Sequence, residues 1–95
     1  MIRLVKMRFR REEVENFKSI FRERRMRIES FPGCYSVRLL QDRNDPQLFF
    51  TYSVWRSPED LEKYRNSEIF KETWRLTRVL FEDKAEAWSL DDTMI

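Results

Sequence analysis

The sequence predicts an α+β fold in which strands and helices follow the order β-α-β-β-α-β. Segments near both ends and in the middle of the chain alternate apolar and polar residues, as half-buried strands do, and apolar residues at helical spacing lie between them. A chain of 95 residues with 41% hydrophobic residues and a single glycine forms one folded domain rather than a disordered segment. This order is the ferredoxin-like arrangement, here with a four-stranded antiparallel sheet that buries one face under helices.

The first strand is expected at about residues 2–9, because Met7 and Phe9 share one face of IRLVKMRF while Lys6 is on the other. A long helix at about residues 12–29 follows, in which apolar residues recur three, four and seven positions apart. The Pro-Gly pair after it ends the helical segment.

The second and third strands form a predicted antiparallel hairpin. CYSVRLLQ and QLFFTYSVW both alternate, which places these strands at about residues 34–42 and 47–55. The Asn-Asp-Pro sequence between them is typical of a tight connection, and strands joined so closely pair antiparallel. One face of the third strand then carries Leu48, Phe50, Tyr52 and Val54, and the other carries Phe49, Thr51, Ser53 and Trp55.

Two helices and a last strand complete the order. The serine of SPED caps a helix and its proline fits the first helical position, which predicts a short helix at about residues 58–65. The Ser-Glu pair of NSEIF predicts a second start and a helix at about residues 68–81. KAEAWSL then predicts the final strand at about residues 84–90.

The second face of the sheet also needs a cover, because helices on one side leave the other side exposed. We expect Phe49 and Trp55 on this open face, joined by Leu4 and Leu40. An apolar sheet face of this kind is buried most simply against a second copy of itself. The sequence therefore predicts a homodimer that associates through the sheet.

The third strand ends in VW, with SPEDLEKYRNSEIFKETW after it and FPGCYSVRLL before it. In these segments the chain resembles the antibiotic biosynthesis monooxygenase (ABM) domain family, also called the dimeric α+β barrels. The resemblance extends from Ile2 to Leu90. It implies a homodimer with one pocket in each subunit, between the helices and the sheet. Characterised members of the family include cofactor-free oxygenases of polycyclic phenols and quinol-like substrates, haem-degrading enzymes, and small signalling or scavenging proteins.

The haem-degrading branch of that family has an asparagine on the first strand, a tryptophan on the short helix and an iron-ligating histidine on the long helix. At those places this chain has Met7, Tyr64 and Trp74, and it contains no histidine. Without histidine the iron would need an unusual ligand, which argues against haem degradation. No cofactor is therefore expected.

The branch that oxidises aromatic molecules without a cofactor resembles the chain more closely. Its tryptophan at the end of the third strand matches Trp55, and its helical arginine matches Arg75 or Arg78, whereas Thr51 stands where the family has asparagine. In such chemistry the substrate reacts with oxygen after losing a proton, so the protein desolvates the ring and holds its oxyanion. No general base is evident. The candidate donors and cationic partners are Thr51, Tyr52, Tyr64 and Arg75.

Four aromatic residues of the third strand and the two later helices allow three hypotheses about function. Trp55, Tyr64, Phe70 and Trp74 either grip a small aromatic or quinone-type molecule or fill the core and the dimer seam. The first hypothesis is a cofactor-independent monooxygenase. The second is a non-enzymatic dimer that senses or sequesters a ligand in the same pocket, and the third is a purely structural dimer with an occluded cavity.

Other kinds of binding function find less support. FRERRMR concentrates arginine on one helix, but a glutamate interrupts it and the net charge is only +2, which favours a solvated helix face over a nucleic-acid site. Cys34 is the single cysteine, so no internal disulfide or zinc cluster is expected, and a reducing cytoplasm is the expected location. Charges interrupt the apolar residues of MIRLVKMRFRR, so we expect neither a signal peptide nor a membrane span.

Overall fold

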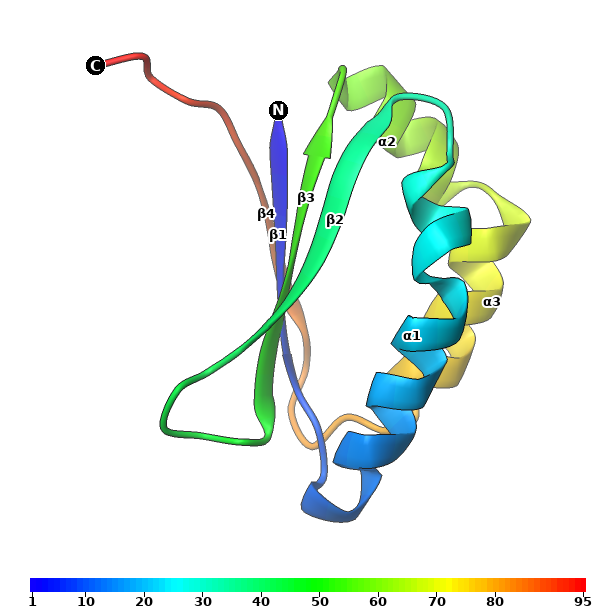
Figure 1. The fold of residues 1–95 in the computed structure, drawn as a ribbon, viewed down its shortest axis with the longest axis vertical. Coiled ribbons are helices and arrows are strands. Elements are labelled where there is room, and N and C mark those ends of the chain that lie inside the picture. Colours follow the sequence, from blue (N-terminus) through cyan, green and yellow to red (C-terminus); the bar gives the residue numbers. More distant parts are fainter.

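All the helices lie on one face of a four-stranded sheet in the computed structural model, which describes residues 1–95 (Figure 1). A short 3₁₀ turn, Arg11–Glu13, leads from the first strand into the first helix. Beyond the last strand, the C-terminal residues extend away from the helices (Figure 1). The strands and helices are β1 (Ile2–Arg8), α1 (Val14–Glu29), β2 (Cys34–Gln41), β3 (Leu48–Trp55), α2 (Pro58–Arg65), α3 (Glu68–Arg78) and β4 (Glu86–Leu90).

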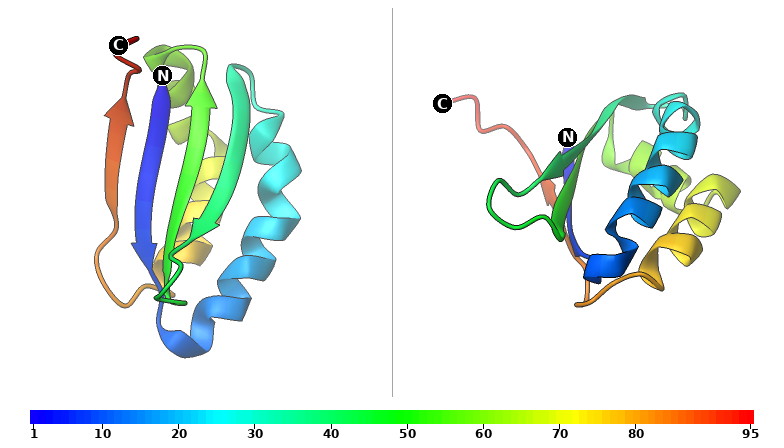
Figure 2. Two further views of the ribbon diagram at one scale, coloured as in Figure 1. Left: turned by 60° about the vertical axis from the view of Figure 1, so that its left-hand side comes forward. Right: turned by 60° about the horizontal axis from the view of Figure 1, so that its bottom comes forward.

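The sheet has the strand order β2-β3-β1-β4, and every neighbouring pair is antiparallel (Figure 2). β1 and β4 pair although they lie at opposite ends of the sequence, with Leu4 opposite Trp88. On its other side β1 pairs with β3, where Met7 lies opposite Phe49. This arrangement confirms the predicted α+β fold of ferredoxin-like type.

Aromatic rings fill the layer between the sheet and α1. Phe9 is fully buried, and Phe49 and Trp55 are each 1% exposed. The Phe9 and Phe17 rings stack with centroids 3.9 Å apart, and Phe17 packs edge-on against Phe49 at 5.4 Å. Such contacts add to the free energy gained by burial, so these rings hold α1 against the sheet.

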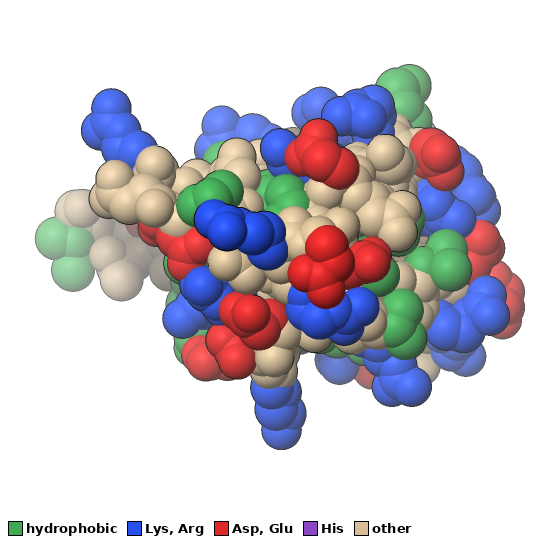
Figure 3. All heavy atoms as spheres, turned by 90° about the horizontal axis from the view of Figure 1, so that it is seen from below, with side chains coloured by type: hydrophobic (Ala, Val, Ile, Leu, Met, Phe, Trp, Pro, Cys, Tyr) green, Lys and Arg blue, Asp and Glu red, His purple; other side chains and the backbone are tan.

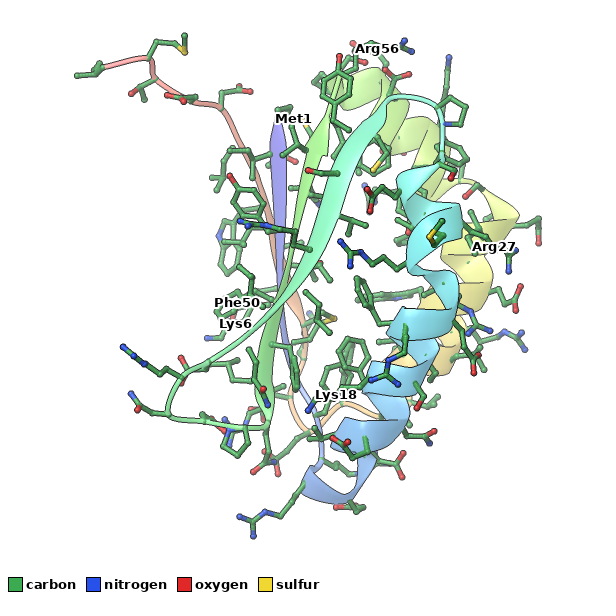
Figure 4. The ribbon with its side chains drawn as sticks, viewed as in Figure 1. Met1, Lys6, Lys18, Arg27, Phe50 and Arg56 are labelled. Atoms are coloured by element: carbon green, nitrogen blue, oxygen red, sulfur yellow. The ribbon has the colours of Figure 1, made fainter.

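The face of β3 that packs against the helices is the one that we expected on the outside of the sheet. Phe49 and Trp55 lie beneath the helices rather than on the open face, so that prediction was wrong. The open face carries Phe50 and Lys6 instead, as their positions in Figure 4 show. Both faces of β3 carry large apolar residues, so alternation alone does not identify the inner one. The pairing of β3 with β1 identifies the inner face, because Phe49 lies opposite the buried Met7.

The open face is nevertheless apolar. Leu40 lies opposite Phe50 across the β2–β3 pair, and Leu4 lies between its neighbours Tyr52 and Trp88. Leu4 and Leu40 are therefore on the open face, as expected, but the β3 residues beside them are not the ones that were expected. The apolar residues of this face are Ile2, Leu4, Leu40, Leu48, Phe50, Tyr52, Val54, Trp88 and Leu90.

Two serine side chains mark the starts of the later helices. Ser57 Oγ accepts a hydrogen bond from the Asp60 N–H at 3.2 Å and begins α2. Ser67 Oγ accepts a hydrogen bond from the Phe70 N–H at 3.3 Å and donates one to the Tyr64 carbonyl at 2.6 Å. The Ser67 side chain thus caps the start of α3 and satisfies a carbonyl near the end of α2.

α3 ends at Arg78, whereas the sequence pattern placed its end at about residue 81. Phe81 leaves the helical path because it forms an isolated β-bridge with Phe9. The same segment is held by the Arg10 N–H, which donates to the Leu80 carbonyl at 3.0 Å. Pairing with the chain beyond β1 therefore replaces the last helical turn.

The arginine-rich segment of α1 includes one residue that packs between helices. Arg24 is 13% exposed and donates to Glu72 Oε1 of α3 at 3.2 Å, while Arg22, Arg25 and Arg27 are exposed. On the face shown in Figure 3, Lys and Arg side chains are interspersed with Asp and Glu. A nucleic-acid site would need a more continuous basic surface there.

No helix combines the length and the apolar character needed to cross a membrane. No three or more His, Cys, Asp or Glu side chains are grouped so that they could hold a metal ion.

Gly33 turns the chain from α1 into β2 in a conformation that favours glycine. Its φ is +89°, in the left-handed region. A Cβ added here would lie 2.4 Å from Cγ of Asp60. The Asp60 carboxylate is held in place, because it accepts hydrogen bonds from Arg56 Nε at 2.7 Å and from Ser57 Oγ at 3.0 Å. Both the backbone angle and the close contact therefore require glycine.

Gly33→Ala should lower the free energy of unfolding by about 3 kcal/mol, because the left-handed alanine and the contact with Asp60 both cost energy. Urea unfolding followed by circular dichroism measures the change. Ser19→Ala, at an exposed position of α1, is the control and should stay within about 0.5 kcal/mol of the wild type. Equal stability of Gly33→Ala and the wild type would contradict this account of the turn.

Candidate functional site

A cavity of about 320 Å³ lies between the sheet and the helices. It is lined by 20 residues, of which 13 are hydrophobic, and they come from every strand and every α-helix. Concave, largely apolar sites of this size enclose small organic molecules. This cavity is therefore the candidate ligand site.

The sheet forms the floor of the cavity. β1 contributes Met7 and β3 contributes Thr51, Ser53 and Trp55, because residues two apart along a strand share a face. The Trp55 indole N–H donates to Ser53 Oγ at 2.9 Å. This hydrogen bond orients the indole and leaves its ring, rather than its N–H, for contact with a ligand.

Aromatic rings of α2 and α3 form a wall above that floor. The Tyr64 ring centroid lies 5.1 Å from that of Trp55 and 5.2 Å from that of Phe70. Phe70 and Trp74 are one helical turn apart, and their rings are nearly parallel, with centroids 6.0 Å apart and an interplanar angle of 8°. Such a wall suits a planar ring system, because aromatic faces and edges both attract flat apolar molecules.

Most of the residues that the sequence suggested for the site come together around the cavity: Met7, Thr51, Trp55, Tyr64, Phe70 and Trp74. Tyr52 lies on the open face of the sheet instead, where its ring centroid is 5.4 Å from the Arg38 guanidinium carbon. Thr51 and Tyr52 are adjacent in one strand and so point to opposite faces. Arg75 is exposed on α3 and does not line the cavity.

Sequence reasoning missed the charged residues of the lining, which are Arg3, Arg65 and Glu86. Arg3 carried a usable signal, because it alternates with Val5 and Met7 on β1 and therefore shares their face. Arg65 ends α2 and Glu86 begins β4, where periodicity says little about direction. Glu86 borders the cavity, but it pairs with Lys6 in the β1–β4 register, so its carboxylate is on the open face of the sheet.

Burial raises the pKa of the Tyr64 phenol far above its ordinary value of 10.0, and the nearby Cys34 thiol, when ionised, raises it further. Tyr64 is 9% exposed, and its hydroxyl makes no hydrogen bond to another residue of the chain. The phenol therefore stays neutral at physiological pH, and its proton remains available for a ligand oxygen.

Two guanidinium groups add positive charge to the lining. Burial lowers the pKa of Arg3, and the nearby Arg65 guanidinium lowers it further, while Glu62 acts in the opposite direction. Arg65 forms an ion pair with Glu62 in which Nη1 and Oε2 are 3.3 Å apart. The cavity thus combines an apolar aromatic interior with a cationic group on its sheet side and another on α2.

Solved structures share this fold at low sequence identity. A structure of an antibiotic biosynthesis monooxygenase is 18% identical, with a TM-score of 0.89, and the match covers 98% of this chain and 99% of that chain. A conserved protein from Methanosarcina mazei Go1 is 22% identical, with a TM-score of 0.85 and coverage of 90% and 86%. A protein from Pseudomonas aeruginosa is 23% identical, with a TM-score of 0.79 and coverage of 96% and 93%.

Comparison of the sequence with protein families is more specific than the likeness of folds. No curated protein matches the sequence. The family model for antibiotic biosynthesis monooxygenases, in contrast, matches residues 1–75, which include the β1 and β3 residues of the floor and the aromatic wall. The chain therefore belongs to the antibiotic biosynthesis monooxygenase family.

Proposed function

We propose that this chain is a cofactor-independent monooxygenase whose substrate is a small aromatic or quinone-type molecule bound in the cavity. The observation that carries the proposal is the combination of an aromatic wall with one neutral phenol, Tyr64, that has no hydrogen-bond partner within the chain. Stacking on the wall would hold the ring of such a substrate, and a hydrogen bond from the phenol would hold its oxygen.

The reaction needs only the substrate and molecular oxygen. A phenolic substrate loses a proton and becomes a phenolate or enolate, whose negative charge is shared with a carbon of the ring. That carbon adds to O₂ and forms a peroxide. The peroxide takes up a proton and collapses to a carbonyl. One oxygen atom remains on that carbon as the carbonyl, and the other leaves as water with two hydrogen atoms of the substrate, one from the C–H bond and one from the phenolic O–H. Desolvation of the ring and stabilisation of its oxyanion are the tasks left to the protein.

Side chains of the lining suit these tasks. Tyr64 can donate a hydrogen bond to the developing oxyanion, and the positive charges of Arg3 and Arg65 favour ionisation of a bound phenol. The lining offers no carboxylate side chain as a base, because Glu86 lies on the open face with Lys6, so the proton that the substrate releases passes to solvent. The apolar wall excludes water, which strengthens each of these interactions.

A non-enzymatic ligand-binding or sensing role is the second candidate. It is favoured by the absence of histidine and by a lining without a carboxylate side chain, since Glu86 pairs with Lys6 on the open face. A cavity without an effective base could hold the same aromatic molecule and leave it unchanged. Turnover with oxygen distinguishes the two roles.

We also propose that two copies pair through the open face of the sheet. Leu40 and Trp88 are each 39% exposed there and Leu90 is 43% exposed, around the partly buried Phe50. The family is typically dimeric, and an apolar face of this extent is well covered by a second copy of the same face.

Oxygen consumption tests the enzyme proposal. With anthrone or 1,4-naphthohydroquinone as the probe, the wild type should accelerate oxygen uptake above the rate without protein. Tyr64→Phe should lower kcat/KM about tenfold, because one hydrogen bond to the developing oxyanion is lost. Tyr35→Phe is the matched control and should keep wild-type kinetics, since Tyr35 is 63% exposed and lies outside the cavity.

Saturable binding of these probes without oxygen uptake would contradict the enzyme proposal and favour the ligand-binding role. Native mass spectrometry of gently purified protein gives an independent reading. A small molecule retained by the wild type and lost after filling the cavity, as in Thr51→Trp, would identify the ligand directly.

Alkaline unfolding should depend on Tyr64. Its pKa is higher in the folded chain than the ordinary value of 10.0, so above that pH the unfolded chain releases a proton that the folded chain keeps. The stability due to this group is therefore fully present below pH 10.0 and is lost as the pH rises further. Tyr64→Phe should flatten the fall in unfolding free energy at alkaline pH, measured by urea titration. An equal slope in Tyr64→Phe and Tyr35→Phe would contradict this expectation.

Phe50→Glu should convert the proposed dimer into a monomer, because it places an unpaired charge within the apolar contact. Light scattering after size-exclusion chromatography measures the mass. Met26→Glu adds the same charge on α1, at a position that is 78% exposed, and should remain dimeric. A monomeric wild type, or a dimeric Phe50→Glu variant, would reject association through this face.

A further inference from the structure

Arg3 differs from the other partly buried arginines of the chain. Arg8, Arg10 and Arg24 each form an ion pair with a carboxylate. Arg3 forms none, and the one hydrogen bond of its side chain goes to the neutral Ser89 hydroxyl at 3.0 Å. A guanidinium has five N–H donors, so most of the hydrogen-bonding capacity of Arg3 is unused within the chain.

Arg65 brings a second positive charge to the same cavity. Its guanidinium is close enough to lower the pKa of Arg3, in addition to the effect of burial. Two like charges repel, and an anion between them relieves that repulsion. The partner of Arg65, Glu62, offers weak competition, because the two side chains are 46% and 63% exposed and exposed ion pairs contribute little.

The positive charge lies beside the aromatic wall. Arg3 is opposite Ser53 in the β1–β3 pair, and Trp55 is the next inward residue of β3. Glu86 is opposite Lys6, so its carboxylate is on the open face, and it lies three residues from Ser89 along β4, a distance of roughly 10 Å. A ring against the wall and an anionic substituent at the arginines can therefore be bound together, away from the carboxylate.

We propose that the cavity selects an aromatic carboxylate, whose ring lies against Tyr64, Phe70 and Trp74 and whose carboxylate is bound by Arg3 and Arg65. Guanidinium groups match the planar carboxylate with paired hydrogen bonds. This inference rests on the proposed function, because it takes the same cavity as the substrate site. It adds the chemical class of the substrate.

Isothermal titration calorimetry of the full chain with 2-naphthoate and its neutral isostere 2-naphthamide tests the inference. The wild type should bind the naphthoate about tenfold more tightly than the amide, because a charge-assisted contact replaces a neutral one. Arg3→Gln should remove this preference and leave the affinity for the amide within about twofold of the wild type. Arg65→Gln should reduce the preference as well, and Arg3→Lys should restore part of it.

Arg27→Gln is the control for a general loss of positive charge, since Arg27 lies on the exposed face of α1, away from the cavity (Figure 4). It should keep the wild-type preference. Equal affinity for the two probes, no binding of the naphthoate, or the same loss of preference in Arg27→Gln would overturn the inference. Equal weakening of both probes by Arg3→Gln would also overturn it, because that result marks a structural role.

Failure of this inference and failure of the proposed function give different results. If the wild type consumes oxygen with neutral naphthohydroquinone but shows no preference for naphthoate, the monooxygenase proposal stands and the anionic class is rejected. If naphthoate binds in an Arg3-dependent manner while 1,4-dihydroxy-2-naphthoate and the neutral probes cause no oxygen uptake, the ligand class stands and the enzyme proposal fails.

Discussion

The register between β1 and β3 is the constraint on which the rest of the structure depends. It sets Met7 opposite Phe49 at the centre of the sheet and commits one face of each strand to the helices. Phe9 and Phe49 then contact Phe17 of α1, so the helix is placed by the same face. A slip of one residue would turn Thr51 out of the cavity, because side chains alternate along a strand.

Local signals explain why the elements could be predicted from the sequence and why one face could not. Capping by Ser57 and Ser67 acts within a few residues, so the helix starts follow from short motifs. The inner face of β3 depends on pairing with a strand far away in the sequence, and both faces of β3 carry large apolar residues. The end of α3 was similarly decided by a distant partner, since Phe81 bridges to Phe9.

The residues of the site also divide into those that local signals predict and those that depend on distant pairing. Tyr64, Phe70 and Trp74 were predictable because helical spacing and the family resemblance both place them together, whereas Arg3 required the face of β1 to be followed to its first residues. Core packing and pocket lining are also not alternatives in the structure. Trp55 and Tyr64 are 1% and 9% exposed and belong to the core cluster, yet both line the cavity. Changes to the wall will therefore alter stability as well as binding.

The three tryptophans lie in three different environments, which gives the unlabelled chain its own optical reporters. Trp55 is enclosed in the core, Trp74 belongs to the cavity wall, and Trp88 is 39% exposed on the open sheet face. Indole emission shifts to longer wavelength as the ring meets water. Fluorescence of variants that retain one tryptophan can therefore separate events in the interior, where Trp55 and Trp74 both line the cavity, from self-association at Trp88.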